Sequence, residues 1–344
     1  MSMDDLFTDA ARQLLGDQCT PQQVRAIEAG ESSQGLWNFI EEAGFADALV
    51  AEAEGGAGLS LAQVFGVLEL CGTYALPVPL AETMLARALL AHAGIPRPLG
   101  SMALAHVHPT TDGGLKCTVV PLGRVANQAL VFDGAGWRLL PVAQAASTPA
   151  AFCLDAGLQW SAAQVASAPL LALRLPEDCN LRTLQACLCA AQLSGALMGV
   201  FQRTLEYAND RNQFGRPIGK FQAIQHQLAV MSEHTFAARM AAQLGCSGPD
   251  FVPDRLRVAV AKARASEAAL VVAELSHSIH GAIGFTEEYD LQLLTRRLHA
   301  WRQTAGAESY WHDVAGSALV DQHHGVALDL IRRTTDPQPQ PEAI

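Results

Sequence analysis

The sequence is poor in aromatic residues and in positive charge. Of its 344 residues, 6% are aromatic and 17% are charged, and 23 Lys and Arg stand against 34 Asp and Glu, giving a formal net charge of −11. Proteins that bind nucleic acids or acidic membranes need clustered basic side chains to neutralise phosphates. We therefore expect neither partner, and a polyanionic cofactor would need local positive pockets.

Paired cysteines with metal-binding spacing are also missing. Eight Cys residues are scattered at positions 19, 71, 117, 153, 179, 187, 189 and 246, and no CxxC pair occurs, although a structural zinc site needs such pairs. Cys187 and Cys189 lie in a helical pattern, in which side chains two positions apart point in different directions. His106 and His108 are too few for a metal site. We expect buried, unpaired thiols and no metal.

Signals for export and for membrane insertion are absent as well. The first fifteen residues are acidic and amphipathic, without the basic region and the unbroken apolar stretch of a signal peptide. We find no stretch long and apolar enough to span a bilayer. The sequence therefore predicts a cytoplasmic protein without a membrane span.

The hydrophobic spacing changes twice along the chain, which suggests three domains. Apolar residues first recur at three- and four-residue steps, then form short runs separated by Gly and Asp, and then return to long helical patterns. Asp133 and Gly134 suit a hairpin turn between two of the short runs. The predicted parts are an N-terminal helical domain (1–100), a shortened central β-domain (101–176), a C-terminal helical bundle (177–334) and a flexible tail (335–344).

The C-terminal part should contain several long antiparallel helices, which make a bundle. Beyond a long helix that starts after position 178, we expect helices near 219–244, 254–280, 289–303 and 307–330. The predicted fold class is thus mainly α with a small β-domain.

One segment, residues 207–231, combines a helix break with strong hydrogen-bond donors. Gly215 and Pro217 interrupt the helical pattern, and Arg211 and Gln213 stand at the interruption. A guanidinium there suits a phosphate or carboxylate, and the start of the next helix adds a favourable dipole. Without further evidence, however, an Arg beside a turn is more often a solvated or capping residue.

The same segment resembles a known family. From Arg211 it reads Arg-x-Gln-Phe-Gly-x-Pro-Ile-x-x-Phe-Gln-x-x-Gln, which is similar to the central signature of the acyl-CoA dehydrogenase C-terminal domain. In that family these residues reach across a subunit interface to the pyrophosphate and adenosine side of a neighbour's FAD. The resemblance implies this role for Arg211, Gln213 and Phe214, and a further FAD-side position for Gln222.

A second stretch, residues 279–289, resembles the family's Gln-x-His-Gly-Gly-x-Gly-Tyr/Phe-Thr-x-Glu motif, with Ser278 in place of the usual Gln. Gly281 and Gly284 would then let the backbone approach the flavin nucleotide closely. The alternative is a glycine that ends a helix, and both can hold. Softer matches at 36–44, 55–59 and 77–83 extend the resemblance over nearly the whole chain, in the family's order of helical domain, β-domain and helical domain.

The expected catalytic base is missing. Family members use a carboxylate to remove the α-proton of an acyl-CoA while the β-hydride goes to the flavin. The two positions where relatives carry it fall on Ala305 and Gln185, and neither side chain is a base. Glu308 could substitute, although a Glu at a helix start more often serves as a favourable N-terminal charge. The catalytic residue therefore stays unassigned. The β-domain also lacks a Thr-Glu-Pro-Gly-like segment, which in the family contacts the flavin ring.

Three functions fit these matches. The first is an active FAD-dependent acyl-CoA dehydrogenase that uses an unrecognised carboxylate and passes electrons to an electron-transfer flavoprotein. The second is a catalytically silent subunit that completes the flavin site of a partner in a heteromeric dehydrogenase. The third, a minor alternative, is a flavin monooxygenase or nitroalkane oxidase on the same scaffold, which would need a base or substrate pocket that the sequence does not show. The short chain resembles subunits of the heteromeric bacterial dehydrogenases that act on steroid side-chain CoA thioesters, which implies a homo- or hetero-oligomer in fatty acid or steroid degradation.

Overall fold

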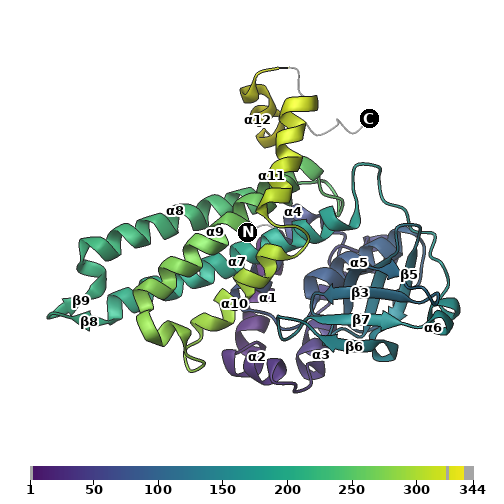
Figure 1. The fold of residues 1–344 in the computed structure, drawn as a ribbon, viewed down its shortest axis with the longest axis horizontal. Coiled ribbons are helices and arrows are strands. Elements are labelled where there is room, and N and C mark those ends of the chain that lie inside the picture. The colour runs from purple at the N-terminus through teal and green to yellow at the C-terminus, as the bar shows by residue number, and fades with distance from the viewer. Residues whose placement is uncertain (1–2, 323–324, 337–344) are drawn as a thin grey trace.

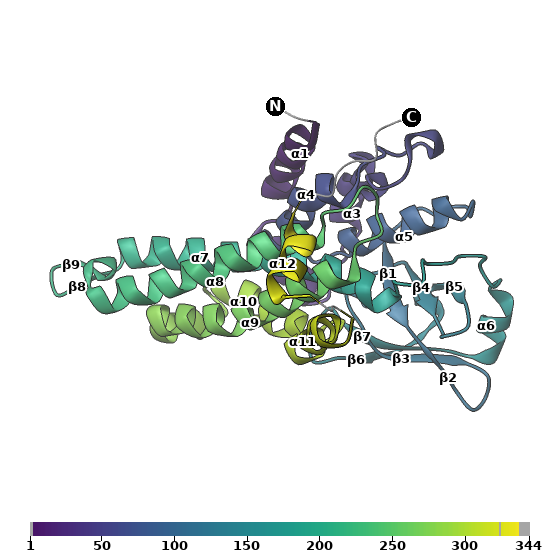
Figure 2. The same ribbon diagram turned by 90° about the horizontal axis from the view of Figure 1, so that it is seen from above.

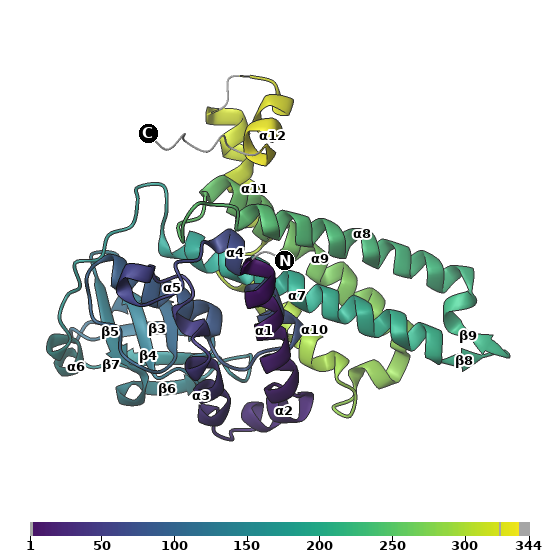
Figure 3. The same ribbon diagram turned by 180° about the vertical axis from the view of Figure 1, so that it is seen from behind.

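The structure is a computed structural model that describes residues 3–322 and 325–336. Long helices and a short hairpin extend to one end of the molecule, the strands of residues 102–160 gather at the other, and the N-terminal helices pack between them (Figures 1 and 3). The predicted fold class, mainly α with a small β-domain, is confirmed. Of the predicted tail, residues 337–344 lie outside the described part of the chain.

The N-terminal part consists of five helices: α1 (Met3–Gln18), α2 (Pro21–Glu28), α3 (Gln34–Glu42), α4 (Leu61–Thr73) and α5 (Leu80–His92). Local sequence explains where they begin. Thr20 caps α2 and is followed by Pro21, and Ser60 and Gln63 form a capping box at the start of α4. Short 3₁₀ turns follow α3, at Phe45–Asp47 and Glu52–Glu54.

The strands form two small sheets around a core that includes Trp160 and Val131. In the first, β1 (Met102–His106) pairs in parallel with β4 (Gln128–Phe132), and β4 pairs with β5 (Trp137–Pro141) in antiparallel fashion. The second is antiparallel, in the order β2 (His108–Pro109), β3 (Leu115–Val120), β7 (Ala156–Trp160), β6 (Ala146–Pro149). Two helical turns, Val142–Gln144 and α6 (Ala162–Ser167), complete this part.

The predicted hairpin turn at Asp133 and Gly134 is confirmed. It joins β4 to β5, with Gly134 at a φ of 91°. The Asp133 carboxylate accepts hydrogen bonds from the backbone N–H groups of Ala135 and Gly136 at 2.9 and 2.8 Å. A side chain that satisfies its own turn in this way explains why Asp precedes Gly here.

The C-terminal part contains the long helices. They are α7 (Leu181–Asp210), α8 (Gln222–Gly245), α9 (Arg255–His280), α10 (Leu291–Gln303), α11 (Glu308–Ser317) and α12 (Ala327–Thr335). A two-stranded hairpin, β8 (Asn212–Gln213) and β9 (Arg216–Pro217), joins α7 to α8, and short turns lie at Ile218–Lys220 and Gly281–Phe285. The prediction of a single helix over 307–330 was wrong, because α11 gives way to a π-helical turn at Ala318–Gln322 before α12 begins.

The expectation that no stretch is long and apolar enough to span a bilayer was also wrong, when only the length and composition of the helices are considered. Both α7 and the segment Arg255–Phe285 are long and apolar enough. In α7, however, 78% of the most apolar window is buried inside the protein, against 44% for the second segment. A helix at the centre of a bundle is apolar around most of its circumference, and this accounts for α7.

Two glycines let α4 and α7 cross at backbone contact. A Cβ on Gly72 would lie 1.8 Å from the carbonyl oxygen of Gln192, and one on Gly195 would lie 1.8 Å from that of Glu69. Both distances are far below van der Waals contact, so no side chain fits at either position. The crossing joins the N-terminal helices to the C-terminal bundle.

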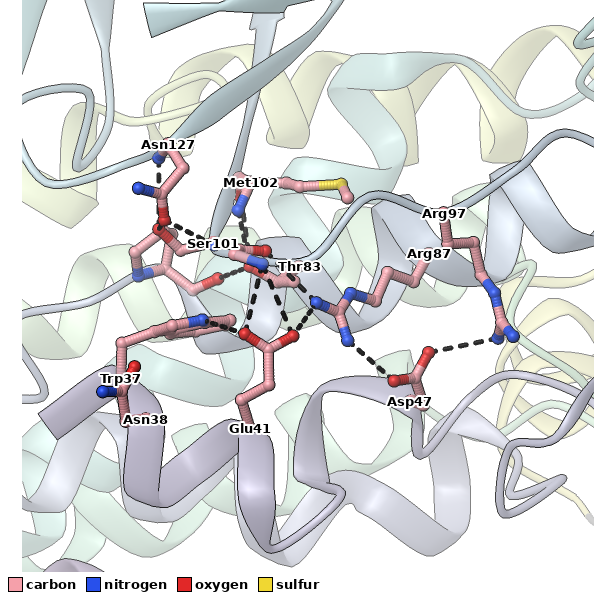
Figure 4. Close-up of polar contacts among 12 residues, drawn as sticks. Trp37, Asn38, Glu41, Asp47, Thr83, Arg87, Arg97, Ser101, Met102 and Asn127 are labelled. Atoms are coloured by element: carbon pink, nitrogen blue, oxygen red, sulfur yellow. Dashed lines mark hydrogen bonds and ion pairs between the residues drawn. The ribbon is translucent and has the colours of Figure 1, made fainter. Parts of the chain in front are cut away.

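A buried polar network fixes the N-terminal helices against the first sheet (Figure 4). The Arg87 side chain, 3% exposed, pairs with Glu41 of α3 and, at 2.7 Å, with Asp47. Glu41 also accepts a hydrogen bond from the backbone N–H of Gly100 at 3.1 Å, and Thr83 accepts one from the N–H of Met102 at 2.8 Å. The start of β1 is therefore held by α3 and α5.

Candidate functional site

A cavity of about 730 Å³ lies where the sheets meet α7 and α10. Residues of β1, β3 and the segment before β7 line it on the side of the sheets. Arg182 and Gln185 of α7 line it as well, together with Arg296 and His299 of α10 and the loop that follows α10. This size suits a small-molecule site.

The two positions predicted for the family's base line this one cavity. Gln185 donates a hydrogen bond from Nε2 to the carbonyl oxygen of Leu104 at 2.9 Å. Ala305 lies in the loop after α10 with a φ of 57°, and its carbonyl oxygen accepts a hydrogen bond from Trp311 Nε1 at 3.1 Å. The structure thus brings the two positions together, and neither carries an ionisable group.

A buried lysine holds this loop. Lys262 of α9 is fully buried, and its Nζ donates to Ser266 Oγ at 2.8 Å, to the Arg302 carbonyl at 2.9 Å and to the Gly306 carbonyl at 3.0 Å. Burial lowers the pKa of Lys262. Two of its three hydrogen bonds therefore hold the turn that carries Ala305, and the third stays within α9.

Glu308, the possible substitute for the missing base, pairs with an arginine. Its carboxylate forms an ion pair with Arg302 of α10, and it does not belong to the cavity lining. Partial burial acts to raise the pKa of Glu308, but the hydrogen bond and charge of Arg302 outweigh it and lower the pKa. The structure therefore gives no support to Glu308 as the base and makes it the partner of Arg302.

Asp155 is the carboxylate that sequence reasoning missed. It lines the cavity, is 8% exposed, and accepts a hydrogen bond from the backbone N–H of Leu122 at 2.9 Å. Burial raises the pKa of Asp155 to about 6, against the smaller effect of that hydrogen bond. No motif marks this position in the sequence, because a single Asp before a short strand resembles any other turn residue.

The residues predicted to reach a neighbour's FAD project from the hairpin after α7. Arg211, Gln213 and Phe214 are all exposed, and Phe214 is 92% exposed with a φ of 51°. Within the described ranges the Arg211 side chain forms no ion pair. A free guanidinium and an exposed ring three positions apart in the sequence would suit a diphosphate joined to an aromatic base, and another molecule would have to present it.

The remaining predicted FAD contacts lie on α8 and at the end of α9. Gln222 and Ser278 are exposed, and Gln227 Nε2 donates to Ser278 Oγ at 3.3 Å, which joins the two helices. Gly281 ends α9 with a φ of 65°, so the helix-cap alternative holds there. A Cβ on Gly284 would lie 2.9 Å from that of His280, so packing within the chain also requires this glycine. Their flavin role stays a prediction.

The long helix α7 carries parts of both sites. Gln185 lies in its second turn and Arg211 caps its C-terminal end. The hairpin lies at the far end of the bundle from the sheets (Figures 1 and 2). The hairpin residues therefore do not contribute to the cavity of their own chain.

Comparison with known sequences gives consistent matches. Residues 183–318 match the family model described as "Acyl-CoA dehydrogenase, C-terminal domain". The chain is 31% identical over 313 residues to "Acyl-CoA dehydrogenase IpdE2" of Mycolicibacterium smegmatis, covering 88% of this chain and 94% of that protein. The protein of the same name from Mycobacterium tuberculosis is 30% identical over 301 residues, covering 87% and 91%.

Solved structures show the same fold. A variant of the Tcur3481-Tcur3483 steroid ACAD superposes with a TM-score of 0.79 at 27% identity, covering 93% of this chain and 98% of that chain. The ChsE4-ChsE5 complex from Mycobacterium tuberculosis gives a TM-score of 0.76 at 21% identity, with the same coverage.

Proposed function

The chain belongs to the acyl-CoA dehydrogenase family, and on that premise we propose that it serves as the subunit that completes the flavin site of a partner, while the partner supplies the catalytic base. The family's enzymes are FAD-dependent and desaturate acyl-CoA thioesters. The observation that carries the proposal is the cavity in which Ala305 and Gln185 occupy both positions of the base.

The exposed hairpin supplies the contacts toward the cofactor. Arg211 would pair with the FAD diphosphate, Phe214 would pack on its nucleotide side and Gln213 would add a hydrogen bond. Gln222, Ser278, Gly281 and Gly284 would lie along the same nucleotide. When bound, FAD accepts the hydride from the substrate's β-carbon. The free guanidinium and the exposed ring support this assignment, since neither has a charged partner of its own in the described chain.

A second candidate is a self-sufficient dehydrogenase in which Asp155 accepts the proton. Asp155 lines the cavity, and a carboxylate with a pKa near the working pH suits a general base. Against it, Asp155 is 8% exposed and already engaged by the N–H of Leu122. We favour the partner subunit for this reason.

The two candidates differ in what the chain does alone. The test compares the purified chain, reconstituted with FAD, with the assembly obtained by coexpressing a dehydrogenase-like protein encoded beside it. The chain alone should desaturate acyl-CoA about 10²- to 10⁴-fold more slowly than the assembly, and Asp155→Asn should leave the assembly's rate unchanged. Rapid turnover by the chain alone, abolished by Asp155→Asn, would establish the second candidate instead.

The finer assignments follow the relatives. Since a 27% identical structure is described as a steroid ACAD, we propose a CoA thioester with a steroid-derived acyl group as the assembly's substrate, an electron-transfer flavoprotein as its electron acceptor and the cytoplasm as its location. Assays with steroid side-chain and straight-chain acyl-CoA, each coupled to reduction of that flavoprotein, test the first two. A preference for straight chains would contradict the substrate proposal, and cell fractionation tests the location.

A further inference from the structure

Two cysteine side chains are in contact inside the C-terminal bundle. Cys187 lies in the second turn of α7 and Cys246 directly follows α8, and their Sγ atoms are 3.6 Å apart. Both residues are 1% exposed, and they are 59 positions apart in the sequence. In the part of the chain that the structure describes, no other cysteine forms a hydrogen bond to a second sulfur. The fold therefore brings together one pair of thiols.

The backbone holds both members of this pair in place. Cys187 belongs to the buried face of α7, which is surrounded by the other helices of the bundle. The backbone N–H of Cys246 donates to the carbonyl oxygen of Ala242 at 3.1 Å, and so continues the hydrogen bonding of α8. A Cβ on Gly245 would lie 2.7 Å from that of Ala261, so the end of α8 rests closely on α9. The two sulfur atoms therefore stay adjacent.

The contact is within reach of a covalent bond. Both residues are free thiols in this structure. A disulfide bond is about 2.05 Å long, so the sulfur atoms would have to approach each other by about 1.5 Å. Rotation about the two Cα–Cβ bonds moves the sulfur atoms over this range. The two helices can therefore keep their positions when the bond forms.

The closed bundle protects the pair from oxidation. The hydrogen bond to Cys246 and burial raise the pKa of Cys187 well above its ordinary value. The thiolate is the form that reacts with oxidants, so a thiol in this state is inert. Reaction therefore requires a local opening that admits water and the oxidant.

The loop between α8 and α9, residues 247–254, is the segment that can open. It contains no helix or strand and begins directly after the pair. Arg257 Nη1 donates to the carbonyl oxygen and to Oγ of Ser247 at 3.1 and 2.9 Å, and the backbone N–H of Leu61 donates to the carbonyl oxygen of Asp250 at 3.0 Å. Segments without a ladder of hydrogen bonds open at lower free energy than helices. Opening of this loop would uncover Cys246 first.

We propose that Cys187 and Cys246 are a redox-sensitive pair, which hydrogen peroxide converts into a disulfide that fixes the second turn of α7 to the end of α8. Peroxide first oxidises the Cys246 thiolate to a sulfenic acid: an S–O bond forms, the O–O bond breaks and one water leaves. Cys187 then attacks this sulfur, so that the S–S bond forms, the S–O bond breaks and a second water leaves. Two thiols and one peroxide thus give one disulfide and two waters. A dithiol reductant reverses the reaction by thiol–disulfide exchange.

Peptide mapping of the purified full-length chain tests the pair. The chain is treated with hydrogen peroxide under native conditions, its remaining thiols are alkylated, and it is digested without reductant. A peptide that joins Cys187 to Cys246 should appear, and dithiothreitol should remove it. Cys187→Ala and Cys246→Ala should each lack it. Cys153→Ala is the matched control, because it removes a more exposed thiol and should form the same bond as the wild type.

The rate of the reaction tests the route through the loop. Arg257→Gln removes the two hydrogen bonds to Ser247, so the loop should open more often and the disulfide should form about two- to tenfold faster. Arg264→Gln removes the same charge from the same helix, but its guanidinium contacts Glu267 and not the loop. Its rate should equal that of the wild type. Equal rates for both variants would contradict this route.

Thermal unfolding measures what the bond does to the bundle. A disulfide that closes a loop of this length should raise the Tm of the oxidised chain by about 5 to 10 °C over that of the reduced chain. Oxidised Cys187→Ala should show no such rise. The proposal is overturned if a folded wild-type chain, verified by circular dichroism, yields no peptide joining Cys187 to Cys246. An unchanged Tm in the cross-linked chain would also contradict it. Neither outcome depends on the proposed function, because both are measured on this chain alone.

Discussion

Gln185 on α7 and Ala305 in the loop after α10 line one cavity. The family resemblance places the base at one position or the other, and in this chain neither residue is ionisable, although Asp155 lines the same space. A base restored at either place would therefore face the same ligand.

Ala305→Glu distinguishes a cavity that lacks only the base from one in which substrate and flavin are not placed for the reaction. If the productive flavin faces the partner, the variant chain, reconstituted with FAD and assayed alone for enoyl-CoA formation, should stay at least about 100-fold slower than the assembly. Ala305→Gln, of similar size but not basic, is the control. A large gain in Ala305→Glu only would show that substrate and flavin are already correctly placed in this chain's own cavity.

Arg211→Ala should lower flavin retention by the assembly. The side chain is exposed and without a charged partner among the described residues, so its removal costs the fold little, while a diphosphate would lose a charge-assisted contact. We expect flavin affinity to fall about tenfold, measured as the ratio of flavin to protein absorbance after dialysis. Arg12→Ala, which removes an exposed arginine of α1, should have no effect. Equal retention in both variants would contradict the proposed role.

Asp155→Asn should stabilise the protein above pH 6. The pKa of Asp155 is about 6 in the folded chain and 3.8 as its ordinary value, so the folded state holds more protons between these values and stability falls as pH rises through them. The variant keeps an acceptor for the N–H of Leu122. It removes the destabilisation that ionised Asp155 causes in the folded state, which is about 3 kcal/mol or less. Urea denaturation at pH 5 and pH 8 measures it, and a gain that is not larger at pH 8 would refute the assignment.

Gly72→Ala should destabilise the protein strongly. The new methyl group would overlap the backbone of α7 at Gln192, and separating two packed helices costs at least about 2 kcal/mol. Gly316→Ala on α11, where a Cβ would meet nothing within 4 Å, should instead gain about 0.5 kcal/mol. Thermal unfolding of both variants measures the difference. Similar melting temperatures would mean that α4 and α7 can move apart without loss of stability.

The sequence predicts the fold class and most helix positions because periodic burial and the family signature are both local patterns. The turn at Asp133 is readable for the same reason, since its side chain satisfies its own backbone. The single helix over 307–330 was wrong because apolar spacing continues across the π-helical turn. Likewise α7 is apolar around most of its surface, and hydropathy does not distinguish a protein core from a bilayer.

The site was harder to predict where residues meet only in three dimensions. Asp155 follows no motif, and Gln185 and Ala305 come from α7 and from the loop after α10, which are far apart in the sequence. Glu308 pairs with Arg302, a contact that the sequence patterns do not reveal. Each of these depends on tertiary packing that single-sequence patterns do not contain.

In the proposed assembly, the length of α7 would also limit which proteins can pair with this chain. One end of the helix borders the cavity and the other carries Arg211, about 40 Å away along its axis. If Arg211 contacts the cofactor of a neighbour as proposed, this distance would set how far the chain reaches, because a helix is a rigid spacer. A subunit whose corresponding helix is one turn shorter would fall about 5 Å short. Compatible partners must therefore match α7 in length as well as in surface chemistry.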